Sequence, residues 1–298
     1  MFFYSQKTTE KALTVTGEYD KILTTSFFGK DAKNVTETLT PGRNKTPCRV
    51  YLVTSAKGGV GKTSVAAGLA ATFAARGLRT LAIDLDLTNR CLDLICGVED
   101  RVTFHILDVL NGTDPERAIF RDTRCENLFY LTAPSGMSLS EEDAAALVRF
   151  LKELRTGGVY DVIVIDTPGS VDRTLHCAAS AADCALVVST EQQTAIRAAE
   201  MTANLLDADG VPEQRLLVNC FESGRGHREK LEKWTCLVRY IDTTSLRLCG
   251  VIPFEHKLWR LQNEGKLLTD RAFAGTALPR IFANVADRLC GHDVPIRF

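Results

Sequence analysis

The sequence predicts an α/β fold in which helices cover both faces of a doubly wound, mostly parallel sheet. From residue 48 onward, short apolar runs rich in β-branched residues alternate with longer helical patterns. A glycine-rich turn also separates the first such run, 49–54, from the first helical pattern, 62–76. Alternation of this kind is typical of parallel sheets, because a helix must carry the chain back to the edge where the next strand starts. Ligands of such folds bind beyond the carboxyl ends of the strands.

The elements follow one another with regular spacing along the chain. The expected strands are 49–54, 80–84, 128–132, 160–166, 184–189, 215–219 and 247–252. The expected helices are 62–76, 141–156, 192–206, 227–240 and 276–290. Nearly continuous apolar runs predict strands that are buried on both faces, as helices on both sides of the sheet would require.

The first 47 residues differ from the rest of the chain. Thr, Lys, Ser and Gly dominate there, and Pro41-Gly42 marks a break before the first expected strand. We therefore expect an N-terminal extension at 1–47, flexible or loosely docked, and one domain at 48–298.

Composition indicates a soluble globular protein. The 298 residues are 45% hydrophobic and 24% charged, and the formal net charge of −1 argues against general nucleic-acid binding. The ten cysteines form no Cys-x-x-Cys motif, and Cys91 and Cys96 are the closest pair. Scattered thiols without a signal peptide favour a reducing compartment, so we expect a cytoplasmic protein. No run of eighteen apolar residues predicts a membrane span.

Residues 57–63 read Lys-Gly-Gly-Val-Gly-Lys-Thr and follow the apolar run 50–53 directly. Strand, glycine-rich loop and helix in this order are the context of a phosphate-binding loop. Glycines let consecutive backbone N–H groups turn inward toward an anion, and the helix behind them adds the positive end of its dipole. Lys62 would reach the β- and γ-phosphates, and the Thr63 hydroxyl would ligate Mg²⁺. The glycine of the strict pattern is replaced by Ala56.

With Lys57 at its start, this loop resembles the deviant Walker A motif of the MinD/ParA family of P-loop ATPases, and the chain resembles the MinD branch most. The resemblance extends over residues 48–298 and implies ATP and Mg²⁺ as cofactors. It also implies that Lys57 crosses a dimer interface to the partner's nucleotide. The nucleotide-binding residues that it implies are Lys57, Gly58, Gly59, Val60, Gly61, Lys62, Thr63, Ser64, Asn219, Pro253 and Glu255.

Carboxylates follow two of the expected strands. Asp84 and Asp86 come at the end of the second, and Asp166 comes at the end of the apolar run 160–165, before Thr-Pro-Gly. A carboxylate at a buried strand end can hold a Mg²⁺ ion that is bound to Thr63.

The resemblance assigns these carboxylates separate roles. Asp166 is similar to the Walker B carboxylate, Asp84 helps to hold the metal and Asp86 orients the attacking water. The implied metal ligands are therefore Thr63, Asp84 and Asp166, and the implied catalytic residues are Lys57, Lys62 and Asp86. The alternative interpretation is that Asp84 and Asp86 are only a pair of solvated carboxylates at a strand end. One departure is Cys91, where the family has an asparagine.

The adenine side depends mainly on the resemblance. Asn219 ends an expected strand, and a lone asparagine there is more often a cap or turn residue. The family places an asparagine at this position against the adenine ring. Gly250–Pro253 followed by Glu255 resembles the loop on the same side of the base.

The resemblance implies a molecular switch that dimerises with Mg·ATP, hydrolyses ATP to ADP and phosphate, and controls spatial positioning or recruits a protein partner. Three alternatives stay open. A ParA-type ATPase for DNA or cargo segregation would need a basic surface, against which the net charge weighs. A weakly hydrolysing scaffold is disfavoured by the complete set of lysines and aspartates. A metal-cluster carrier would need paired cysteines.

Membrane binding is expected to be weak or absent, and no nucleic-acid partner is expected. MinD-type chains usually end in a short basic amphipathic helix, and this sequence stops where that helix would begin. The apolar stripe of the last expected helix is a core face instead: Leu278, Ile281, Phe282, Val285 and Leu289. Trp234 and Trp259 also lie on apolar helical faces and are expected in the core.

Overall fold

The structure is a computed structural model that describes residues 47–222 and 227–296. The chain divides into two units, Met1–Lys45 and Thr46–Phe298, and the second contains all of the described residues. The expected N-terminal extension at 1–47 lies outside the described residues except for Pro47.

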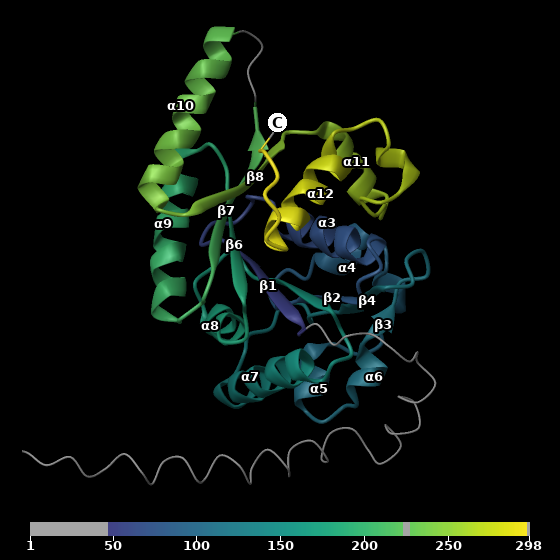
Figure 1. The fold of residues 1–298 in the computed structure, drawn as a ribbon. Helices are drawn as coiled ribbons and strands as arrows, with labels where there is room; N and C mark the ends of the chain where they lie inside the picture. Colours follow the sequence, from purple (N-terminus) through teal and green to yellow (C-terminus); the bar gives the residue numbers. More distant parts are fainter. Residues whose placement is uncertain (1–46, 223–226, 297–298) are drawn as a thin grey trace, which may run out of the picture. The chain divides into compact units, whose positions relative to one another are not determined.

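An eight-stranded sheet organises this unit, with the strand order β3-β4-β2-β5-β1-β6-β7-β8 (Figure 1). Neighbouring strands are parallel except for β3, which pairs antiparallel with β4 at one edge. This arrangement confirms the expected doubly wound, mostly parallel sheet. The strands are β1 (Arg49–Thr54), β2 (Thr80–Asp84), β3 (Phe120–Arg121), β4 (Leu128–Leu131), β5 (Val162–Asp166), β6 (Cys184–Ser189), β7 (Gln214–Phe221) and β8 (Arg247–Pro253).

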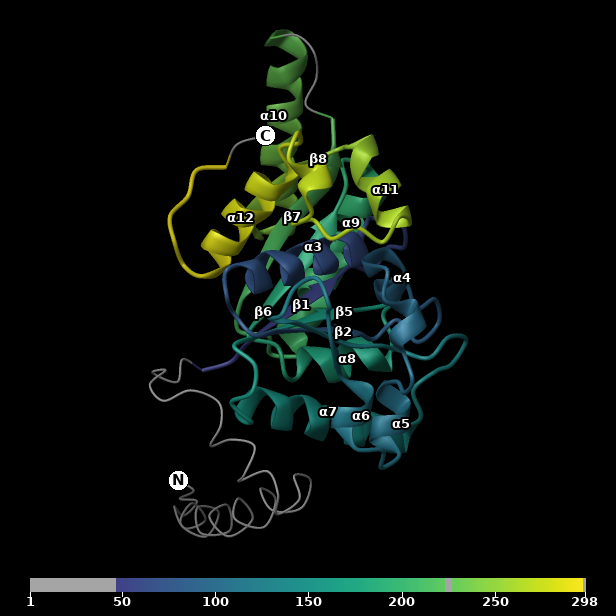
Figure 2. The same cartoon turned by 90° about the vertical axis from the view of Figure 1, so that its right-hand side faces the viewer.

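Helices cover both faces of the sheet, as the two perpendicular views show (Figures 1 and 2). One face carries α3 (Lys62–Ala75), α4 (Leu92–Cys96), α11 (His256–Asn263) and α12 (Leu278–Leu289). The other face carries α5 (Ile106–Leu110), α6 (Pro115–Ala118), α7 (Glu141–Thr156), α8 (Arg173–Ala179), α9 (Gln193–Ala208) and α10 (His227–Thr244).

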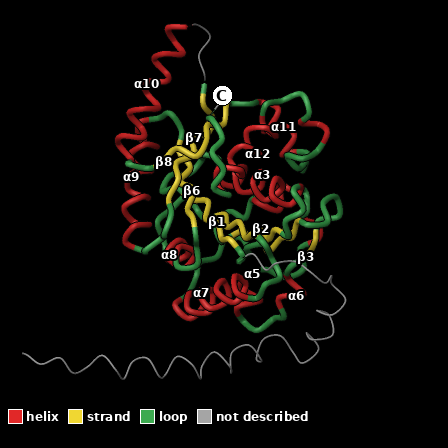
Figure 3. Tube along the Cα trace, viewed as in Figure 1, coloured by secondary structure: helices red, strands yellow, loops and turns green. Residues whose placement is uncertain are grey.

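Two separate hydrophobic cores result, one on each side of the sheet. Figure 3 shows the strands running between two layers of helices. In β1, Val50 and Leu52 belong to the core under α7–α10, whereas Tyr51 and Val53 belong to the core under α3 and α12. Successive side chains of a strand point to opposite faces, so a strand between two helical layers must be apolar at every position. This requirement is the physical reason for the continuous apolar runs in the sequence.

The strand order brings three sequence motifs to one place. β1 lies between β5 and β6, and the chain winds outward from it in both directions. In the register of the sheet, Val53 and Asp84 are both partners of Asp166. The loop after β1 and the carboxylates that end β2 and β5 therefore meet at the carboxyl edge of the sheet.

The expected strands and the five expected helices are all confirmed to within a few residues. The short elements β3, α4, α5, α6, α8 and α11 were not expected, because segments this short carry too little periodicity for assignment from sequence. The apolar stripe of α12 is confirmed as a core face, since all five of its side chains are buried. Within the described ranges, no helix has the length and apolar character that crossing a membrane requires.

Trp259 corrects one expectation, because its side chain is 71% exposed instead of buried. It lies on the short helix α11, whose one buried side chain is Leu261. Residues two apart on a helix point in nearly opposite directions, so burying Leu261 turns Trp259 outward. The side chain of Trp234 lies outside the described part of the chain.

Candidate nucleotide-binding site

The glycine-rich loop connects β1 to α3 and ends at Gly61, the N-cap of the helix. Gly61 has φ +90° and ψ +28°, a left-handed conformation that favours glycine. Among the described residues, no side chain caps the first turn of α3, and that turn holds no acidic residue. The free N–H groups and the dipole of this helix therefore face the loop, where an anion would be stabilised.

Lys62 is the first residue of α3, and its side chain is buried. Its ammonium group donates to the Lys57 carbonyl oxygen at 3.3 Å. Burial lowers the pKa of Lys62, and the carboxylates of Asp166 and Asp86 act against that shift. An ammonium group has three donors, so Lys62 keeps donors for an incoming anion.

Lys57 is held by its own chain. Its ammonium group donates to Gln192 Oε1 at 2.6 Å and to Thr194 Oγ1 at 2.9 Å. Both acceptors lie at the start of α9, directly after β6. Nothing in the local sequence marks Gln192 or Thr194 as a partner of the loop, so these contacts were not expected.

Asp166 is the most unusual group at this edge. The residue is 1% exposed, and neither of its carboxylate oxygens has a hydrogen-bond partner within the described part of the chain. Burial and the nearby Asp84 raise the pKa of Asp166 well above its usual value. The nearby Thr63 hydroxyl and Lys62 ammonium group lower the pKa of Asp166 in part. Burying an unpaired carboxylate destabilises the folded protein unless a cation or a hydrogen-bond donor pairs with it.

Asp84 is also buried, but its oxygens are engaged. Oδ1 accepts from the Asp86 N–H at 2.8 Å, and Oδ2 accepts from the N–H groups of Cys91 and Leu92 at 3.1 and 3.0 Å. Burial raises the pKa of Asp84 to about 6, while the backbone donors lower it in part. Asp84 therefore holds the segment from Asp86 to Leu92 in place.

Asp86 lies just beyond β2 and is partly exposed. Its carboxylate accepts from the backbone N–H groups of Thr88 and Asn89 at 3.2 and 3.0 Å. The group thus folds the turn that follows it and still reaches solvent at the carboxyl edge.

Thr63 and Asp166 fit a Mg²⁺ ion. Mg²⁺ prefers oxygen ligands and is commonly held by one or two carboxylates together with phosphates and water. The orphaned oxygens of Asp166 supply such a ligand beside Thr63. Across the residues that are described, no three His, Cys, Asp or Glu side chains form an all-protein metal site. A site completed by phosphates does not need one.

The segment after Asp166 packs directly on the phosphate loop. A methyl group added at Gly169 would lie 2.9 Å from Gly58 Cα and 3.2 Å from Lys62 Nζ. Only a residue without a side chain fits at this distance. A change in the conformation of the loop should therefore displace the segment that follows β5.

The residues expected on the adenine side reach the same edge but make different contacts. Asn219 donates from Nδ2 to the Val60 carbonyl oxygen at 2.8 Å. Pro253 ends β8, and the Glu255 carboxylate caps α11 by accepting from the Lys257 N–H at 3.0 Å. The Ser64 hydroxyl of α3 donates to Gln262 on α11 at 2.9 Å, a contact that the sequence did not indicate.

A family model described as "ParA: NUBPL iron-transfer P-loop NTPase" matches residues 47–290. The chain belongs to the ParA/MinD family of P-loop NTPases. Septum site-determining protein MinD of Synechocystis is 31% identical over 249 residues, which cover 83% of this chain and 91% of that protein. The resemblance seen in the sequence is thereby confirmed.

Solved structures of the family share the fold. A MinC:MinD cell division protein complex from Aquifex aeolicus matches with a TM-score of 0.74 and 29% identity, over 84% of this chain and 98% of the other. MinD of Pyrococcus horikoshii, complexed with Mg-ADP, matches with a TM-score of 0.68 and 26% identity, over 81% and 96%.

Proposed function

We propose that this protein binds Mg·ATP, dimerises with a second copy of itself and hydrolyses ATP to ADP and phosphate. In this proposal it is a molecular switch that controls spatial positioning or recruits a regulatory protein. The observation that carries the proposal is the buried Asp166 carboxylate, which lies beside Thr63 and Lys62 and finds no hydrogen-bond partner among the described residues. A metal-bound triphosphate would complete all three groups at once.

The contacts at the site support a separate role for each of these residues. Lys62 and the first turn of α3 bind the phosphates, and Thr63 and Asp166 hold Mg²⁺, with Asp84 keeping the neighbouring segment in place. When bound, the metal would offset negative charge on the phosphates. Asp86 orients the attacking water from its partly exposed turn, which its own carboxylate keeps folded.

Dimerisation would use Lys57. Its side chain must leave Gln192 and Thr194 before it can reach a nucleotide on a second copy. In the conformation described above, this lysine is therefore held on its own subunit. Its arrival at the partner's phosphates would add a positive charge where negative charge develops.

A protein partner would recognise the nucleotide state through the segment that follows Asp166. Because Gly169 lies against the phosphate loop, the presence of the γ-phosphate changes the space that this segment can occupy. One family structure is a complex of MinD with a second protein, which supports a protein partner for this chain as well.

One variant tests the proposal. Asp86→Ala should bind ATP, accumulate as a dimer in light scattering and hydrolyse ATP at least about tenfold more slowly, because the water is no longer positioned. Lys57→Ala is the matched control and should bind ATP, stay monomeric and turn over slowly.

Loss of ATP binding in Asp86→Ala would make its role structural, and normal turnover by Lys57→Ala would exclude the cross-dimer role. Sedimentation of the trapped dimer with anionic liposomes and with DNA separates the related alternatives. We expect little pelleting with either.

A further inference from the structure

The strand that carries Asn219 is irregular at that residue. In the pairing of β7 with β8, Val218 faces Val251, and Phe221 faces Pro253. Two residues of β7, Asn219 and Cys220, therefore oppose one residue of β8, which defines a β-bulge. Cys220 has φ +54°, in the left-handed region that residues with a side chain seldom adopt.

The bulge changes the side of the sheet to which the next side chain points. Leu217 belongs to the core under α3, and strict alternation would place Asn219 and Phe221 on that side too. Phe221 instead packs in the opposite core with Leu216 and Val218. The extra residue thus anchors Phe221 on one face and leaves Asn219 on the other, under the phosphate loop.

Asn219 is buried there against the loop. Its side-chain amide donates to the carbonyl oxygen of Val60 at 2.8 Å, across 159 residues of sequence. A carbonyl oxygen only accepts, so the nitrogen of the amide must face it. A methyl group added at Gly61 would collide with this same nitrogen. The amide therefore occupies the space that a side chain at Gly61 would need.

This contact determines the direction of a loop N–H group. The carbonyl of Val60 and the N–H of Gly61 belong to one planar trans peptide and point in opposite directions. Holding the carbonyl toward Asn219 therefore fixes the Gly61 N–H in the opposite direction, away from Asn219. Convergent N–H groups are what bind phosphate in such loops.

We infer that Asn219 is a positioning residue for the phosphate-binding loop, whatever contact it also makes with the base. This inference rests on the proposed nucleotide-binding function. Its observable consequence is that Asn219 contributes to binding of a ligand that has phosphates and no base.

The test compares Mg·ATP with Mg·tripolyphosphate by calorimetry. Asn219→Leu has nearly the same size and no donor, and it leaves the buried Val60 carbonyl without a partner. We expect both ligands to bind about tenfold more weakly, because an unsatisfied buried acceptor has an effect of this size. Weaker ATP binding with unchanged tripolyphosphate binding would overturn the inference and make Asn219 a base contact alone.

Two further variants serve as controls for the comparison of the two ligands. Asn263→Leu makes the same chemical change at an exposed position of α11 and should leave both affinities unchanged. Asn219→Asp keeps the shape and an acceptor for the base but loses the donor, and serves if melting shows Asn219→Leu to be unfolded. The added charge affects both ligands, so the ratio of their affinities should stay near that of the unmodified protein. If Asn219→Asp loses more affinity for ATP than for tripolyphosphate, the inference is contradicted.

The proposed function and this inference fail differently. If the unmodified protein binds neither ligand, the proposed function is wrong. If it binds both and the Asn219 variants lose only ATP affinity, the inference alone is wrong.

Discussion

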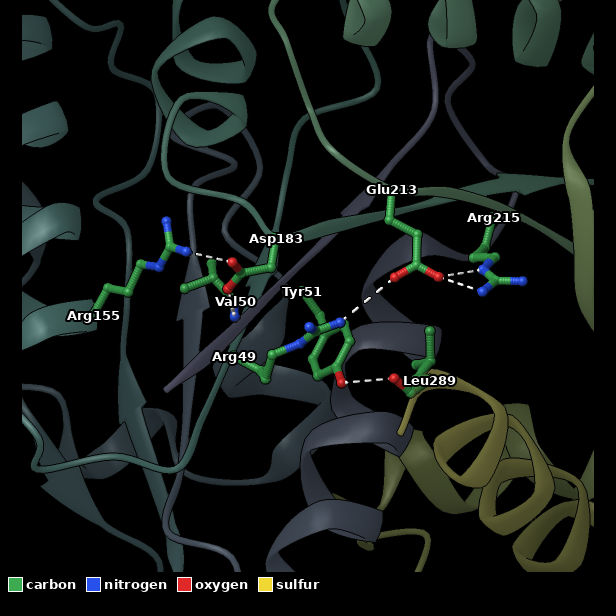
Figure 4. Close-up of polar contacts among 8 residues, drawn as sticks. All are labelled: Arg49, Val50, Tyr51, Arg155, Asp183, Glu213, Arg215 and Leu289. Carbon is green, nitrogen blue, oxygen red and sulfur yellow. Dashed lines mark hydrogen bonds and ion pairs between the residues drawn. The ribbon is translucent and has the colours of Figure 1, made fainter. Parts of the chain in front are cut away.

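The amino and carboxyl edges of the sheet differ in whether their charged side chains are paired. At the amino edge, every charge in Figure 4 meets an opposite charge or a backbone group. Asp183 accepts from Arg155 at 2.5 Å and from the Val50 N–H at 2.8 Å. Glu213 pairs with Arg49 at 3.5 Å and with Arg215. At the carboxyl edge, by contrast, the described residues offer Asp166 no hydrogen-bond partner.

This difference separates stability from function within one sheet. Paired charges at the starts of β1, β6 and β7 fix the strands relative to one another and need nothing from outside. The carboxyl edge keeps Lys62 and Asp166 buried and incompletely satisfied, which disfavours the ligand-free fold. Such a site gains most when a metal-bound triphosphate arrives. Variants at the two edges should therefore change different observables.

Lys62→Ala should have the largest effect, at the carboxyl edge. We expect ATP binding to weaken by about 100-fold or more, because the loop loses its buried cation. The thermal midpoint of the ligand-free protein should change little, since removing a cation from a desolvated site offsets the loss of its contacts. Calorimetry and a melting curve measure both quantities. A large loss of stability with ATP affinity intact would break the comparison.

Asp166→Asn should stabilise the ligand-free protein while it weakens Mg·ATP binding. The raised pKa means that the folded state holds a proton that the unfolded state has released, so stability falls as pH rises from about 4 toward the folded pKa. The stabilisation should therefore be larger at pH 7 than at pH 4, and about 2 kcal/mol at pH 7, the scale of an unsatisfied buried group. Denaturant unfolding of both proteins at the two pH values measures the difference. Equal stabilisation at both values would show that the buried charge of Asp166 is not the cause.

Asp183→Ala tests the amino edge. Asp183 is largely buried, and its loss leaves Arg155 and the Val50 N–H without their acceptor. We expect the free energy of unfolding to fall by about 1–2 kcal/mol, with ATP affinity unchanged. A change in ATP affinity without a change in stability would show that the two edges are coupled.

Glu213→Gln should have the smallest effect. Its partners are Arg49, whose side chain is 45% exposed, and Arg215, whose side chain is 16% exposed. A glutamine keeps an oxygen that can accept from both arginines, and partly exposed ion pairs contribute about 1 kcal/mol or less. The difference should shrink further in high salt, because the charges are screened. If this variant is as destabilised as Asp183→Ala, the pair contributes more than its exposure indicates.

The sequence by itself determined the features that arise from short-range patterns. Continuous apolar runs predicted the central strands, because a strand with helices on both sides must bury every side chain. The motif from Lys57 to Thr63 predicted the phosphate loop, because its glycines and helix start act over a few consecutive residues. Asp84 and Asp166 were found in the same way, from their places at the ends of apolar runs.

Only the tertiary structure decided which of these groups meet. Gln192 holds Lys57 across 135 residues because β6 lies beside β1. The local periodicity of the sequence does not predict the order of the strands. Asn219 reaches Val60 because β7 places its side chain on the face that carries the loop, while one extra residue turns Phe221 to the opposite face. Trp259 is exposed because a helix as short as α11 buries one narrow face, which Leu261 takes. Each outcome depends on packing between distant segments, and local propensity does not encode that packing.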